Sequence, residues 1–133
     1  MIGASCQKEP PKGSYTGHFE GYFITENEIV HYTTDYLFEI KKVTKSEIHL
    51  QEKTSLMTSI LQKKANESIV GKIGFGKIYN PSQDGSPPFS TIDIYGKYYK
   101  ENAKTYISGT FTTNISSKGI SYPSEGNFVL RSE

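Results

Sequence analysis

The feature that most constrains this fold is a glycine–x–aromatic pattern set within strictly alternating segments. One stretch reads SYTGHFEGYFI, and its Tyr15, Gly17, Phe19, Gly21 and Phe23 fall on one face. Because side chains leave a strand on alternate sides, this stretch is expected to be a half-buried β-strand. Glycine is costly in a flat strand, but it fits where a strand bends sharply and an aromatic neighbour covers the gap. The pattern therefore favours a strand that coils into a small barrel.

The same pattern recurs in later alternating segments, as Gly96-Lys97-Tyr98, Gly109-Thr110-Phe111 and Gly126-Asn127-Phe128. Recurrence in the first and last strands is typical of a closed barrel. We expect an all-β fold, a single closed or nearly closed eight-stranded antiparallel up-and-down β-barrel whose first strand pairs with its last. The expected strands lie near residues 15–25, 29–42, 47–51, 53–67, 68–79, 89–100, 105–114 and 125–131.

The stretch Lys53–Glu67 fits two structures. Its apolar residues are spaced as in a helix, with Thr54 or Ser55 as a possible cap. A strand is favoured because the stretch lies between two expected strands and completes an even number of them. The helical alternative would lie as a lid across one mouth of the barrel.

Composition excludes several functions. Fifteen basic and fourteen acidic residues in a chain of 133 give a net charge of +1, and the lysines are scattered, so no nucleic-acid surface is indicated. The three histidines fall on polar strand faces, which gives no sign of a metal site. No nucleophile has an evident base. Gly71, Gly74 and Gly76 continue a strand instead of opening a helix, as a phosphate-binding loop would. We expect no enzyme activity, no metal and no cofactor.

The start of the chain suggests a lipid anchor. Ala4-Ser5 precede the single Cys6, as small residues do at a bacterial lipoprotein cleavage site, although Gly3 stands where a leucine is usual. The Pro-Pro-containing polar segment that follows has the composition of a tether. We therefore expect residues 1–13 to be a lipobox remnant and flexible tether, residues 14–133 to be the barrel domain, and Cys6 to be lipidated.

Anchor, tether, compact eight-stranded barrel and chain length together resemble the potempins, outer-membrane lipoproteins that inhibit secreted peptidases. The resemblance implies a protein at the outer membrane or cell surface, with a soluble domain that inhibits a secreted peptidase, serine class favoured, and is a monomer when free. The barrel also resembles lipocalin-like and avidin-like carriers of small apolar ligands, whose first strand has Gly-x-Trp where this chain has Gly17-His18-Phe19. A cavity inside the barrel would favour the carrier, and a filled interior with ordered loops would favour the inhibitor.

Two segments are candidates for the inhibitory contact. A peptidase cleft favours a segment that is already ordered, because ordering a floppy loop costs affinity. The first candidate is the proline-stiffened loop that ends at Phe89; the second is the apolar pair Leu56 and Met57 in a polar frame. The loop residues are Asn80, Pro81, Ser82, Gln83, Asp84, Gly85, Ser86, Pro87, Pro88 and Phe89.

Overall fold

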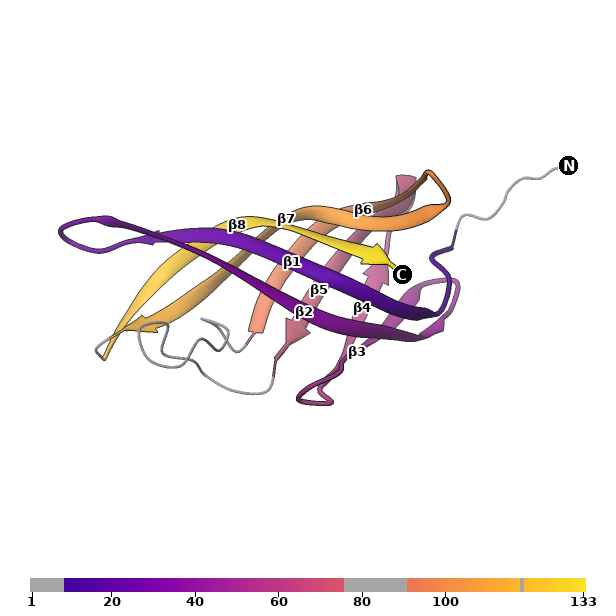
Figure 1. Ribbon diagram of the computed structural model, residues 1–133, viewed down its shortest axis with the longest axis horizontal. Helices are drawn as coiled ribbons and strands as arrows, with labels where there is room; N and C mark the ends of the chain where they lie inside the picture. Colours follow the sequence, from indigo (N-terminus) through magenta and orange to yellow (C-terminus); the bar gives the residue numbers. More distant parts are fainter. Residues whose placement is uncertain (1–8, 76–90, 118) are drawn as a thin grey trace, which may run out of the picture.

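Eight antiparallel strands form the barrel in chain order. The computed structural model describes residues 9–75, 91–117 and 119–133. Each strand pairs with the next, and β1 pairs with β8, so the sheet is closed (Figure 1). This confirms the expected all-β up-and-down barrel. The strands are β1 (Gly13–Ile24), β2 (Ile29–Val43), β3 (Glu47–Glu52), β4 (Thr58–Lys63), β5 (Ser68–Gly74), β6 (Thr91–Glu101), β7 (Lys104–Ser117) and β8 (Ile120–Ser132).

Paired glycines allow the backbones to approach closely at two seams of the barrel. Gly21 of β1 lies opposite Gly126 of β8, and Gly96 of β6 lies opposite Gly109 of β7. A Cβ atom on Gly126 would overlap the carbonyl oxygen of Glu20. The first and last strands can therefore close the barrel only because this position has no side chain.

Aromatic rings fill the middle of the barrel. The ring centroid of Phe19 lies 5.7 Å from that of Phe75, 6.0 Å from those of Phe111 and Phe128, and 6.2 Å from that of Phe38. All five side chains are buried. The expected inward face is thus confirmed, and side chains fill the interior, as is usual for an eight-stranded barrel.

The ambiguous stretch Lys53–Glu67 divides into a turn, a strand and a single 3₁₀ turn. Lys53–Met57 connects β3 to β4, and Ala65–Glu67 is the 3₁₀ turn. The strand interpretation is right for β4, in which Leu61 is buried and Ile60 is half exposed. No α-helix forms over this stretch.

The β7–β8 hairpin is longer than the alternating pattern indicates. β7 runs to Ser117, and β8 begins at Ile120 instead of Glu125, with Pro123 inside it. The pairing of β8 with β1 ends at Ser124, so Pro123 has no β1 neighbour. Its missing N–H therefore removes no hydrogen bond to β1.

The connections alternate between the two ends of the barrel, as the up-and-down order requires. The β1–β2, β3–β4 and β7–β8 connections lie at one end, which we call the turn end. The start of β1 and the end of β8 lie at the other, the terminal end (Figure 1). At the terminal end Pro10 is buried, the Tyr15 hydroxyl donates to the carbonyl of Pro11 at 2.8 Å, and Lys63 pairs with Glu9 at 3.2 Å. The described part of the N-terminal segment therefore contacts the barrel.

Candidate functional site

The candidate residues Leu56 and Met57 lie together in the β3–β4 turn, at the turn end of the barrel. The other candidate loop, residues 80–89, lies outside the described residues, as does Cys6. Of the two candidate segments, the β3–β4 turn is the one that lies within the described residues.

A buried carboxylate accepts hydrogen bonds from the backbone of the β3–β4 turn. Glu52 is 2% exposed, and its two carboxylate oxygens accept hydrogen bonds from the backbone N–H groups of Thr54 at 2.9 Å and Ser55 at 2.8 Å. Burying a carboxylate is costly unless it is hydrogen-bonded. These two bonds therefore offset the cost of burying the Glu52 carboxylate, and they fix the first half of the turn.

Further hydrogen bonds fix the second half of the turn. The backbone N–H of Glu52 donates to the carbonyl of Met57 at 2.9 Å, and that of Leu56 donates to the carbonyl of Glu52 at 2.9 Å. The Gln51 side-chain amide donates to the carbonyl of Leu56 at 3.2 Å. The N–H of Lys53 bonds the carbonyl of Leu37 on β2 at 2.9 Å, which ties the turn to the neighbouring strand.

Leu56 is held in an unusual conformation with its side chain outward. Its φ angle is 64°, in the left-handed region that residues other than glycine seldom adopt. Its side chain is nevertheless 63% exposed, the most exposed of the large apolar residues described. Leu56 therefore has a strained backbone although its side chain contributes little to the core. Strained backbone of this kind is concentrated at functional sites.

Met57 and two strand residues also expose apolar surface. Met57 is 41% exposed, and its Cε atom lies against Gly74 at the end of β5. Leu37 on β2 and Ile60 on β4 are also about half exposed.

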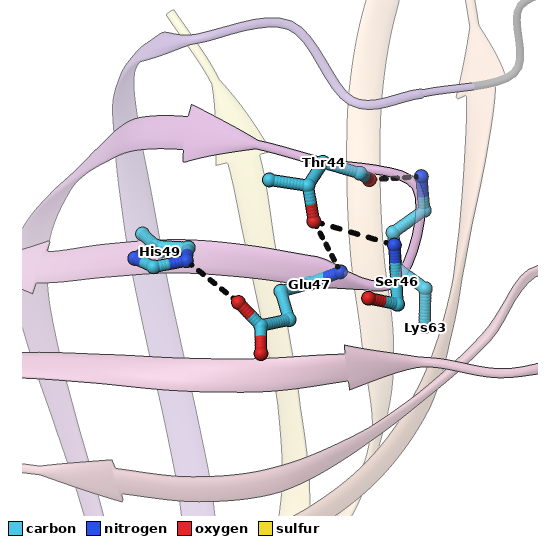
Figure 2. Close-up of polar contacts among 5 residues, drawn as sticks. All are labelled: Thr44, Ser46, Glu47, His49 and Lys63. Atoms are coloured by element: carbon cyan, nitrogen blue, oxygen red, sulfur yellow. Dashed lines mark hydrogen bonds and ion pairs between the residues drawn. The ribbon is translucent and has the colours of Figure 1, made fainter.

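The β2–β3 turn at the terminal end is equally well braced but polar. Figure 2 shows the Thr44 hydroxyl accepting from the backbone N–H of Ser46 at 3.3 Å and of Glu47 at 3.0 Å, while the Lys63 ammonium donates to the Thr44 carbonyl at 3.0 Å. Glu47 also bonds His49 at 3.0 Å. Bracing alone therefore does not distinguish the β3–β4 turn; bracing combined with exposed apolar side chains does.

The histidines lie on outer strand faces, as expected. His18 bonds Asp35 through Nδ1 at 2.5 Å and Glu20 through Nε2 at 2.9 Å. The hydrogen bond to Asp35, then that to Glu20, raises the pKa of His18 above its ordinary value. Among residues 9–75, 91–117 and 119–133, no group of three or more histidine, cysteine or acidic residues is placed to hold a metal ion.

A hollow of about 530 Å³ lies on the rim of the turn end, between the end of β1 and the β7–β8 hairpin. Its lining mixes apolar residues such as Phe23 with polar ones such as Asp93, Asn114 and Glu125. Its size falls within the roughly 300–1,000 Å³ of small-molecule pockets, but it lies outside the aromatic interior in which a lipocalin-like carrier would hold its ligand.

Sequence reasoning found Leu56 and Met57 but missed Glu52. The signal was present, because period two places Glu52 on the same face as Ile48 and Leu50. A carboxylate on an apolar face needs donors, and the backbone of a following turn can provide them.

In the described part of the chain, no helix combines the length and apolar character needed to cross a membrane. Comparison of the chain with protein-family models, with curated proteins and with solved structures finds no match in any of the three.

Proposed function

We propose that this protein is a binding module that inhibits a secreted peptidase through its β3–β4 turn. The observation that carries the proposal is the turn itself, in which Glu52 braces a strained backbone that presents Leu56 to solvent. A segment ordered before binding avoids the entropic cost of ordering it in the complex. Recognition commonly resides in loops carried on a rigid scaffold.

The conformation of Leu56 indicates how the contact would be made. A peptide in a peptidase cleft usually binds as an extended strand, whereas a φ of 64° belongs to a chain reversal. The turn would therefore insert Leu56 as an apolar knob into a hydrophobic pocket, with Met57 beside it, and would not imitate a cleavable substrate. A serine peptidase with an apolar specificity pocket is the target class that fits this knob.

The proposal includes an anchor at the opposite end of the barrel. A lipid on Cys6 would hold the protein at the outer membrane or cell surface through a short polar segment. The terminal end, where β1 begins, is opposite the β3–β4 turn, so an anchored barrel would keep the turn available to a partner. We expect mass spectrometry of the native membrane fraction to find a lipidated Cys6; an unmodified cysteine in a soluble form would contradict the anchor.

The experiment is an inhibition screen of the purified protein against subtilisin-like, chymotrypsin-like and trypsin-like peptidases and peptidases secreted by the source organism. Two variants locate the contact: Leu56 and Met57 both changed to Asp, and residues 81–88 replaced by a short Gly-Ser linker. Inhibition lost only in the first assigns the contact to the β3–β4 turn. Loss only in the second assigns it to the loop at residues 80–89.

The small-ligand carrier is the alternative, and the rim hollow is the observation in its favour. If the protein slows no peptidase and an apolar small molecule co-purifies with it, the carrier replaces the inhibitor. The aromatic interior around Phe19 supports the inhibitor, because it leaves the middle of the barrel filled by side chains.

A further inference from the structure

The barrel has one long strand edge that no described strand covers. β2 pairs with β1 from Ile29 to Ile40, but its pairing with β3 begins only at Phe38. Within the described residues, the segment from Ile29 to Leu37 therefore has a strand partner on one side only. We call this segment the β2 edge.

The hydrogen-bonding direction of the β2 edge follows from a single bond. The carbonyl of Leu37 accepts from the N–H of Lys53, which comes from the side of β3 and not of β1. Backbone groups alternate in direction along a strand, and the β1–β2 register has no shift. The N–H and C=O groups of Ile29, His31, Thr33 and Asp35 therefore point away from β1, toward the side on which no described strand pairs with them.

Apart from the charge of Asp35, this edge lacks the sequence features that usually prevent strand pairing. Natural edges are blunted by charged side chains, above all lysine, and by proline, bulges or short length. The β2 edge contains neither lysine nor proline, has an unbroken register with β1, and carries Ile29 at 58% and Leu37 at 51% exposure at its two ends. Such an edge is suited to receive another strand.

The sequence of the β2 edge is complementary to itself in the antiparallel direction. Placing a two-fold axis at Thr33 sets Ile29 opposite the Leu37 of a second copy, and His31 opposite its Asp35. Thr33 of one copy then faces Thr33 of the other. The backbone N–H and C=O groups of all these residues point away from β1, so each pair can exchange two hydrogen bonds. The side chains are exposed on the outer face, which joins apolar to apolar and base to acid across the axis.

We propose that two copies of this protein associate through their β2 edges, antiparallel about Thr33, to form a symmetric dimer with a continuous sheet across the interface. The occupant is a second copy because a single register of the chain with itself satisfies the apolar ends, the charged pair and the backbone groups together. An interface of this kind is isologous, since the same segment serves on both subunits. The proposal departs from the free monomer expected from sequence alone and does not depend on the peptidase proposal.

The first test compares two variants at the axis by sedimentation or light scattering over a dilution series. Thr33→Pro removes an N–H that points away from β1, so the barrel keeps its own bonds, whereas Thr33→Ala keeps that N–H. The wild-type and Thr33→Ala proteins are expected to reach twice the monomer mass at high concentration, and Thr33→Pro to stay at the monomer mass. A wild-type monomer at every concentration, or a dimer that Thr33→Pro leaves intact, would overturn the proposal.

The second test does not depend on how well the proline variant folds. His31→Asp faces the partner's Asp35 with a like charge, and Asp35→Lys removes the acid opposite the partner's His31. Each variant alone is expected to be monomeric, while an equimolar mixture forms a heterodimer because the introduced carboxylate of one variant then faces the introduced ammonium of the other. Circular dichroism controls for the fold, since Asp35 also bonds His18. A mixture that stays monomeric while the wild-type protein dimerises would contradict this register.

Discussion

At the scale of single residues, the polar groups of this barrel are placed in two ways. Glu52 is buried because a turn supplies it with two backbone donors, whereas His18 stays on the outer face between Asp35 and Glu20. The first arrangement shapes the backbone, and the second forms an exposed ion-pair cluster. Their contributions to stability should therefore differ in size and in dependence on pH.

His18 should stabilise the protein only where it is protonated. Its pKa is raised in the folded state, so its contribution is fully present below the unfolded value of about 6.5 and is lost as the pH rises through the folded pKa. Because the side chain is 41% exposed, the effect should stay below about 1 kcal/mol. We expect His18→Ala to lower the free energy of unfolding more at pH 5.5 than at pH 8.5 in urea denaturation. Equal losses at the two pH values would contradict the ion-pair role.

Removing the charge of Glu52 should loosen the β3–β4 turn. Glu52→Gln keeps the shape but leaves one carbonyl oxygen where two carboxylate oxygens accept the N–H groups of Thr54 and Ser55. We expect a loss of about 1–3 kcal/mol in unfolding free energy, since hydrogen bonds to buried charges are in that range. The amides of Thr54 and Ser55 should also exchange faster with solvent. Glu47→Gln on the same strand is the control. A similar loss of unfolding free energy in that variant would contradict the role of Glu52 in bracing the turn.

At the scale of secondary-structure elements, glycine determines where strands can approach each other. Gly126 faces Gly21 across the β1–β8 seam, and Gly109 faces Gly96 across the β6–β7 seam. Aromatic partners then cover the space that the glycines leave, as with Phe111 opposite Gly126. The recurring glycine–x–aromatic pattern thus provides what each of these two seams of the closed barrel requires, a glycine that lets the strands approach and an aromatic ring that fills the space beside it.

A methyl group at Gly126 should open the seam between β1 and β8. Its Cβ would overlap the backbone carbonyl of Glu20, which cannot rotate away as a side chain can. We expect Gly126→Ala to cost about 1–3 kcal/mol or more, as overpacking does, measured by thermal and chemical unfolding. Gly74→Ala is the matched control, because its Cβ would meet side chains only, the flexible end of Met57 at 3.2 Å and the methyl group of Thr91 at 3.9 Å. Equal effects of the two changes would argue against a backbone-limited seam.

The barrel was predictable from sequence because its signals are local and repeated. Alternation and the glycine–x–aromatic pattern identified the strands, the inward face and the pairing of the first strand with the last. The turn at Lys53–Met57 was not predictable in the same way. Its conformation depends on the burial of Glu52 and on the bond from Lys53 to Leu37, and both arise only when β2 and β3 are side by side.

At the scale of the whole molecule, the barrel separates its chain termini from its apolar turn. Glu9, Pro10 and Pro11 contact the barrel at the terminal end, while Leu56 is exposed at the turn end. The β2 edge is a third surface, formed where the long β2 extends past the short β3 (Figure 1). Anchoring would use the terminal end, whereas peptidase binding and self-association would use adjoining surfaces, since Lys53 of the β3–β4 turn bonds Leu37 at one end of the β2 edge.

The most direct test of the account is the inhibition constant of Leu56→Asp against a peptidase that the wild-type protein inhibits. Ile120→Asp is the control, since Ile120 is also at the turn end and is 54% exposed. If Leu56 fills an apolar pocket, its loss should weaken inhibition by at least about 30-fold, the effect of removing a binding hot spot. Ile120→Asp should change inhibition little, and both variants should unfold at the wild-type temperature. Inhibition by Leu56→Asp at the wild-type level would contradict the β3–β4 turn as the inhibitory site.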